Sequence, residues 1–109
     1  MSLYAEYLTE RTNDQILEVE NGFATYRFID NDTVYIVDIY VKPEVRKSKL
    51  ASVMADEIAI IAKERGCTKM LGTCNPSTKG STTSLKVLFS YGMELLSASN
   101  DLIVVQKEI

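Results

Sequence analysis

The sequence predicts an α+β fold with an α/β-type crossover: a mixed, mostly antiparallel sheet of about six strands with two main helices. Three observations indicate this class. Residues 15–41 alternate strand-like runs with short turns, residues 50–65 repeat apolar side chains at helical spacing, and the chain closes with a second hairpin pattern. With 109 residues, 46% of them hydrophobic and 25% charged, we expect a single domain over residues 1–109.

Composition excludes several classes of function. A formal net charge of -3 disfavours a protein that binds nucleic acid through bulk electrostatics. The chain has no histidine, the commonest general base and metal ligand, so we expect no metal site. The N-terminus lacks a leader pattern, and no apolar run approaches the roughly 20 residues of a membrane span. We therefore expect a cytoplasmic protein with neither a nucleic-acid nor a membrane partner.

The first third is predicted to be a short helix followed by an antiparallel meander. Residues 2–12 place Leu3, Tyr7 and Leu8 at helical spacing. Asn21-Gly22 is a strong two-residue hairpin signal between two strand-like runs. The expected strands of this third are residues 15–20, 23–29 and 34–41.

The strand at 34–41 is apolar on both faces apart from Asp38, which is typical of a central strand covered on both sides. The helix at 50–65 is followed by Gly66, a good residue for ending a helix. A further strand is expected at 68–74. Two strands joined through a helix imply a right-handed parallel crossover.

The last third is predicted to be a loop, a helix and a closing hairpin. Its expected elements are a polar loop at 75–83, a helix at 84–91 and strands at 93–98 and 102–106. The final strand is apolar enough at 102–105 to pair across a dimer. Cys67 and Cys74 lie at opposite ends of one expected strand, about 23 Å apart, which excludes a disulfide between them. Each is expected to be a small buried hydrophobic residue rather than a reactive thiol.

A basic turn precedes the central helix. Arg46, Lys47 and Lys49 stand just before Leu50, where the helix is expected to begin. The first N–H groups of a helix have no intrahelical partner, and its dipole is positive at that end, so this geometry suits a phosphate. The alternative is that the turn is simply basic and solvated.

The same stretch resembles the GNAT superfamily of acetyl-coenzyme A dependent N-acetyltransferases. The family has a central strand ending in V-x-P, then a pyrophosphate-binding turn of the form [QR]-x-x-G-x-[GA], then a long helix. Here the strand ends in Val41-Lys42-Pro43, Arg46 fits the first position of the turn and Ala51 the last. Lys49 stands in place of the first glycine. The order of elements is also similar, over about residues 15–107.

The resemblance implies acetyl-coenzyme A as co-substrate. Its pantetheine arm would pair with the central strand where that strand separates from the next parallel one, and its pyrophosphate would lie at the turn. The coenzyme-binding residues implied are Ile39, Tyr40, Val41, Arg46, Lys47, Ser48, Lys49, Leu50, Ala51 and Asn75.

The implied reaction is acetyl transfer to a primary amine of a small molecule or protein, which needs a base for the ammonium. Asp38 is the first candidate, because an acid within an apolar strand should be desolvated. An acid at this place also resembles members that acetylate polyamines; a satisfied structural hydrogen bond is the alternative. Tyr35 stands where some members keep a glutamate base, with core packing as its alternative. Strand alternation separates these two residues onto opposite faces, unless the bulge that is characteristic of the family in this strand changes the parity.

Two departures from the family pattern leave a second function open. Leu88 occupies the position of a tyrosine that often protonates the departing thiolate, and Tyr91 should face elsewhere on its helix. The segment before the first strand is also short, so the acceptor side is expected to be open or to be completed by a homodimer or partner protein. The alternative function is a catalytically inactive GNAT-like binding or structural subunit. An unrelated α+β domain that binds a phosphorylated ligand at 46–49 is a third possibility.

Overall fold

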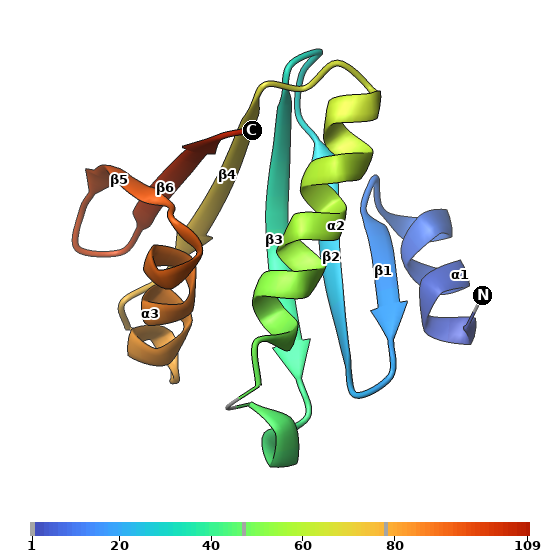
Figure 1. Ribbon diagram of the computed structural model, residues 1–109, viewed down its shortest axis with the longest axis horizontal. Helices are drawn as coiled ribbons and strands as arrows, with labels where there is room; N and C mark the ends of the chain where they lie inside the picture. The colour runs from blue at the N-terminus through green and yellow to red at the C-terminus, as the bar shows by residue number, and fades with distance from the viewer. Residues whose placement is uncertain (1, 47, 78) are drawn as a thin grey trace.

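The computed structural model describes residues 2–46, 48–77 and 79–109, and Figure 1 shows how their helices and strands are arranged. In chain order the elements are α1 (Leu3–Arg11), β1 (Gln15–Val19), β2 (Gly22–Phe28), β3 (Thr33–Val41), the short 3-10 helix η1 (Pro43–Val45), α2 (Leu50–Glu64), β4 (Lys69–Cys74), α3 (Ser81–Tyr91), β5 (Glu94–Ala98) and β6 (Ile103–Glu108). The predicted α+β class is confirmed. None of the helices in these ranges is long and apolar enough to cross a membrane.

The six strands form one sheet in the order β1-β2-β3-β4-β6-β5. β3 and β4 are parallel and joined through α2, as the predicted crossover requires, and the other pairs are antiparallel. The apolar strand predicted at 102–106 does not lie at a sheet edge, where it could pair with a second copy. β6 pairs with β4 on one side and with β5 on the other, so both of its edges are occupied and β5 is the edge strand.

The core lies between the sheet and two helices, α2 and α3, which cover the same face (Figure 1). The apolar stripe of α2 buries Met54 and Ile58 completely, against Val34, Met70 and Val105 of three neighbouring strands. Because apolar residues recur every three or four positions along α2, one side of the helix supplies the whole contact. The two helices are also joined directly, by a hydrogen bond between Tyr91 and Asp56.

α1 forms as predicted but buries a different side. Ala5 and Leu8 are buried, whereas Leu3 is 82% exposed and Tyr7 is also exposed. The side chain of Ser2 caps the helix by accepting from the Ala5 N–H. The small Ala5 side chain allows a close approach to the sheet, so it takes the contact that was expected for the larger residues.

Two further expectations are corrected. β3 is covered on both faces only in its first half, since Tyr40 is 40% exposed and Asp38 is exposed as well. α3 begins at Ser81 rather than at 84, and the preceding loop is shorter than predicted. Its first turn is polar and carries no apolar periodicity, so the sequence pattern misses it; Gly80 precedes the helix with a positive φ of 82°.

We expect Ile58→Ala to lower the free energy of unfolding by about 2–5 kcal/mol, because it leaves a cavity in a fully packed core. Ile58 is completely buried, whereas Ile60 on the same helix is 58% exposed. The matched control Ile60→Ala should change the free energy by only about 0.5 kcal/mol. Urea denaturation of both variants measures the difference. Equal losses would contradict this description of the α2 packing.

Candidate functional site

The site is the gap that opens where two parallel strands separate. β3 and β4 pair over four residues each, from Thr33 opposite Lys69 to Ile36 opposite Gly72. Beyond that pair the two strands diverge, and β3 continues to Val41 without β4 beside it. Backbone groups of β3 that point toward the missing strand are left to face the gap, which suits a ligand that can pair with a strand edge.

A bulge in β3 changes which residues share a face. Thr25 of β2 is opposite Asp38, but the next residue, Tyr26, is opposite Ile36, so Val37 is the extra residue. Arg27 then pairs with Tyr35. Thr25 and Arg27 lie on one face of β2, so their partners Asp38 and Tyr35 also share a face, the one opposite α2. Simple alternation does not hold here, because a bulge of the kind that the family resemblance implies changes the parity.

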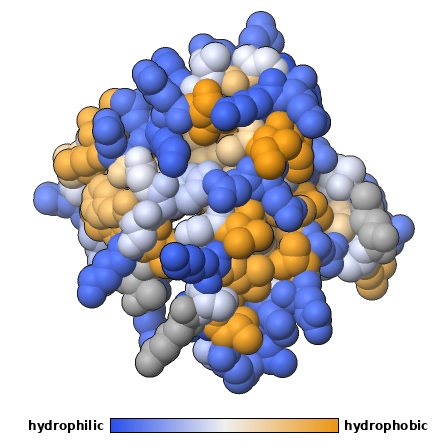
Figure 2. Space-filling model, in the orientation of Figure 1, coloured by the Kyte–Doolittle hydropathy of each residue, from blue (hydrophilic) through white to orange (hydrophobic). Residues whose placement is uncertain are grey.

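A cavity of about 560 Å³ fills the gap, a size typical of small-molecule sites. It is built from β3, β4, α3 and the segments that precede α2 and α3. Figure 2 shows the surface hollowed between the part of the molecule formed with α2 and the part formed with α3. Of the residues predicted from sequence, those that line the cavity are Asp38, Ile39, Tyr40, Val41, Arg46, Ala51 and Asn75.

The other predicted residues lie outside this lining. Tyr35 is one residue pair short of the gap, where its hydroxyl bonds Thr73. Ser48 donates to the Val45 carbonyl at 2.6 Å, and Lys49 and Leu50 are the N-cap and first residue of α2. Lys47 lies outside the described residues.

The start of α2 is arranged for an anion. Its N-cap residue Lys49 makes no side-chain capping bond, and the first turn carries no acidic residue. Lys49 has a φ of -89°, so this position does not need the conformational freedom of glycine. Arg46 donates from Nε to the Val41 carbonyl at 2.9 Å, and its guanidinium carbon lies 5.4 Å from the centre of the Tyr40 ring. A cation and uncapped helix N–H groups therefore meet at one end of the cavity.

Asp38 lies in the cavity wall, but not in the environment expected for it. The prediction of a desolvated carboxylate is wrong, because Asp38 is exposed. The reason is the position of the residue beyond the β3–β4 pairing, on the sheet face that α2 and α3 leave uncovered. A carboxylate there is accessible both to a ligand and to water.

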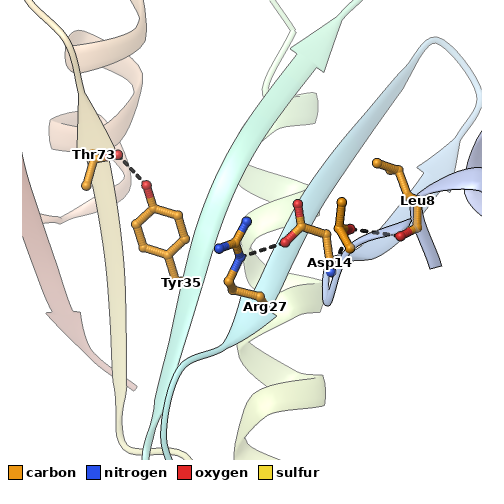
Figure 3. A network of polar contacts seen from close by, with 6 residues as sticks. Leu8, Asp14, Arg27, Tyr35 and Thr73 are labelled. Atoms are coloured by element: carbon orange, nitrogen blue, oxygen red, sulfur yellow. Dashed lines mark hydrogen bonds and ion pairs between the residues drawn. The ribbon is translucent and has the colours of Figure 1, made fainter. Parts of the chain in front are cut away.

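A line of polar side chains crosses this open face (Figure 3). The Tyr35 hydroxyl hydrogen-bonds the Thr73 hydroxyl at 2.5 Å. On the other side of Tyr35, Arg27 donates from Nε to Asp14 at 2.6 Å. Asp14 is 6% exposed, and its N–H donates to the Thr12 hydroxyl. These side chains thus run from Asp14, just before β1, across β2 and β3 to β4, and Thr73 is the one in the cavity wall.

α3 contributes an apolar wall. Leu88 and Val87 line the cavity. Tyr91 points away, as predicted, and donates from its hydroxyl to Asp56 at 2.8 Å. Burial, followed by that hydrogen bond, raises the pKa of Tyr91. Among the described side chains of α3, no tyrosine hydroxyl reaches the cavity.

Sequence reasoning missed several lining residues. They are Ile36, Val37, Gly72, Thr73, Cys74, Lys79, Gly80 and Val87. Those on β4 could have been found, since ligands often bind beyond the carboxyl ends of parallel strands. Lys79 and Gly80 gave no such signal, because they lie in a polar loop whose path the sequence does not specify. Cys67 and Cys74 are both buried and neither is in a disulfide, as expected, although Cys74 also lines the cavity.

The geometry defines a class: an α+β protein with a cleft between diverging parallel strands and a cationic helix start at one end. Residues 8–82 match the sequence profile of the acetyltransferase (GNAT) family. The chain therefore belongs to that family. A search of curated proteins finds no relative with significant sequence similarity.

Solved structures share the fold. The PaiA N-acetyltransferase from Thermoplasma acidophilum, in complex with coenzyme A, is similar with a TM-score of 0.78 and 15% identity; the match covers 95% of this chain and 66% of that protein. A GNAT family acetyltransferase from Elizabethkingia anophelis with acetyl-CoA bound gives 0.73 and 18%, over 98% and 82% of the two chains. An acetyltransferase from Bacillus cereus gives 0.75 and 18%, over 95% and 84%. This chain thus spans just under two thirds of the Thermoplasma protein.

We expect the loss of Arg27 to lower the free energy of unfolding more than the loss of the Asp14 charge does. Arg27→Met leaves the Asp14 charge buried without its partner and should cost about 1–3 kcal/mol of unfolding free energy. Asp14→Asn leaves an arginine whose side chain is 43% exposed and can be hydrated, so its loss should be smaller. Urea denaturation at neutral pH compares the two variants. A larger loss for Asp14→Asn would contradict this ranking.

Proposed function

We propose that the protein transfers an acetyl group from acetyl-coenzyme A to a primary amine. The observation that carries this proposal is the cleft between β3 and β4, which has an anion-suited helix start at one end and an accessible carboxylate, Asp38, along its wall. Family membership supports the reaction class. The acceptor is an amine of a small molecule or of a protein.

Two features of the cleft would bind the coenzyme: the unpaired edge of β3 and the start of α2. The pantetheine arm, which carries amide groups, pairs with the β3 edge at Ile39, Tyr40 and Val41, where β4 no longer occupies it. The pyrophosphate lies at the start of α2, bound by Arg46 and by backbone N–H groups of Lys49, Leu50 and Ala51. Asn75 and Lys79 close the opposite wall. Coenzyme A and acetyl-CoA in two structures of the same fold support this assignment.

The chemistry needs a proton acceptor and support for the thioester oxygen. Asp38 takes the ammonium proton directly or through water, since its carboxylate is exposed within the cleft. Backbone N–H groups of β3 that face the gap beyond Ile36 donate to the oxygen as negative charge develops on it. The acceptor enters from the face of the sheet opposite α2, and a second copy of the chain or a partner protein completes that side.

One observation favours a second candidate function, a coenzyme-binding subunit without turnover. Leu88 lines the cavity at the position where the family often has a proton-donating tyrosine. Binding of acetyl-coenzyme A is common to both candidates, whereas acetylation of any amine belongs to the first alone. The protein is incubated with acetyl-coenzyme A and a panel of primary amines, and the release of free coenzyme thiol is measured. Amine-dependent release supports the acetyltransferase, and its absence supports the coenzyme-binding subunit.

Acetyl-coenzyme A should raise the melting temperature by several degrees at about one hundred times its dissociation constant, which corresponds to about 2.7 kcal/mol of added stability. Coenzyme A should act similarly and ATP much less. In Arg46→Met the same shift should require about tenfold more ligand, because a charged contact to phosphate is lost. Arg11→Met removes an exposed charge on α1 and is the matched control. The absence of any shift at millimolar acetyl-coenzyme A would remove both candidates.

Asp38→Asn should lower kcat/KM for the amine by about a hundredfold, since general-base catalysis contributes factors of this size. Its melting temperature and coenzyme affinity should stay near wild type, because the carboxylate is exposed. Glu20→Gln, which removes an exposed charge in the β1–β2 turn, should leave the rate unchanged. Steady-state kinetics with acetyl-coenzyme A and 1,4-diaminobutane measure the effect. A wild-type rate in Asp38→Asn would exclude this residue as the base.

A further inference from the structure

We propose that Thr73 is the proton donor to the departing coenzyme thiolate, with Tyr35 and Arg27 as positioning residues behind it. This inference rests on the proposed function and assigns the step for which α3 supplies no hydroxyl. The assignment follows from the polar side chains on the sheet face opposite α2, Asp14, Arg27, Tyr35 and Thr73, because Thr73 is the one that lines the cavity.

Thr73 is placed at the vertex of the cleft. It is the first residue of β4 beyond the last pair with β3, Ile36 opposite Gly72, and it lines the cavity. An acyl thioester bound along β3 from the start of α2 ends at this vertex. Cys74 and Asn75, the next residues of the same wall, lie farther toward the mouth.

Thr73 is not an isolated hydroxyl. A threonine alone is a poor acid, but its hydroxyl shares a hydrogen bond of 2.5 Å with the Tyr35 hydroxyl, in which either oxygen can donate. A phenol, with an ordinary pKa of about 10, is close in acidity to a thiol, at about 8.5, so a proton can pass between them with little free-energy change. Through Thr73 this phenol reaches the cleft, although Tyr35 itself does not line it.

Arg27 supplies the compensating charge. It lies directly opposite Tyr35 in the β2–β3 ladder and is held by the buried Asp14. The pKa of the Arg27 guanidinium is raised, first by its hydrogen bond to Asp14 and also by the negative charge that Tyr35 carries when ionised. A guanidinium in this place can offset negative charge that develops on the Tyr35 oxygen during the transfer. Asp14 fixes Arg27 there through its hydrogen bond.

The step balances as follows. The neutral amine nitrogen forms a bond to the thioester carbonyl carbon, and the carbon–sulfur bond breaks. The leaving sulfur takes the proton of the Thr73 hydroxyl, which takes that of Tyr35. The Tyr35 phenolate, beside Arg27, then recovers a proton from water. Asp38 already holds the ammonium proton, so the proton that the acceptor nitrogen releases after bond formation goes to solvent. It offsets the proton that Tyr35 takes from water, and the products are the acetylated amine and the coenzyme thiol.

The charged groups around Tyr35 are few. Arg27 faces it from β2, with Asp14 behind the arginine. β4 contributes Lys69, two residues before the Leu71 partner of Tyr35 and therefore on the same face. Along β3 the bulge brings Asp38 to this face.

The test compares wild type with Thr73→Val, Thr73→Ser and Tyr35→Phe, using acetyl-coenzyme A and 1,4-diaminobutane. Thr73→Val keeps the shape without the hydroxyl and should lower kcat about a hundredfold. The dissociation constant of coenzyme A should change less than twofold. Thr73→Ser should restore kcat to within about threefold of wild type. Tyr35→Phe keeps the ring but removes the hydroxyl behind Thr73, so it should lower kcat about tenfold while the KM for the amine stays within about twofold of wild type.

The possible results distinguish a failure of the Thr73 assignment from a failure of the proposed function. Wild-type kcat in Thr73→Val would overturn the inference while leaving the proposed function intact. Equal losses in Thr73→Val and Thr73→Ser would also overturn it, because packing rather than the hydroxyl would then matter. A wild-type protein that binds acetyl-coenzyme A but acetylates no amine would instead refute the proposed function, and this inference with it. Melting curves of all variants confirm that the folds compared are the same.

Discussion

Four residue pairs hold the parallel strands β3 and β4 together, and every feature of the site depends on the pairing ending there. Hydrogen bonds along a parallel ladder fix the two strands at about 4.8 Å. Where the ladder ends, the strands can diverge and leave backbone groups of β3 facing open space. The last paired residue of β4 is Gly72, and a Cβ atom there would lie 3.5 Å from Leu88, so α3 packs closely on the β4 side. α2 packs on β2 and β3 instead, and the two helices help to hold the two halves of the sheet apart (Figure 1).

The region where β3 and β4 pair stabilises the sheet despite the cleft beyond it. Val34 and Met70 sit opposite each other in the paired region, both completely buried beneath α2. Tyr91 and Asp56 also connect α3 and α2 directly by a hydrogen bond. The core thus spans both halves where the strands pair, and the cavity lies beyond it. A cavity of this size reduces the packing available to a chain of 109 residues, which is a physical reason to propose a function for it.

The sequence predicts the elements well because their signals are local. Apolar periodicity identifies α2, Asn21-Gly22 identifies the first hairpin, and the order strand-helix-strand implies the parallel crossover. The site depends on relations that no local pattern contains. The run from Thr33 to Val41 shows no sign that Val37 is a bulge, so only the family resemblance allowed for a shared face of Tyr35 and Asp38, and the exposure of Asp38 was not predicted. The resemblance places several residues in the cleft, but it cannot identify Thr73, whose role depends on a partner 38 positions away.

Leu88 can be understood as a consequence of the same packing. It contacts the core and the cleft at once, since it lies over Gly72 and also lines the cavity. A tyrosine there would have to place a larger ring in that space. The open face of the sheet offers a different route to a hydroxyl, because Thr73 reaches the vertex from the side opposite α3 and is hydrogen-bonded to Tyr35. On the mechanism proposed above, the proton comes from the sheet rather than from the helix, and the Asp14–Arg27 pair serves catalysis as well as the stability of the fold.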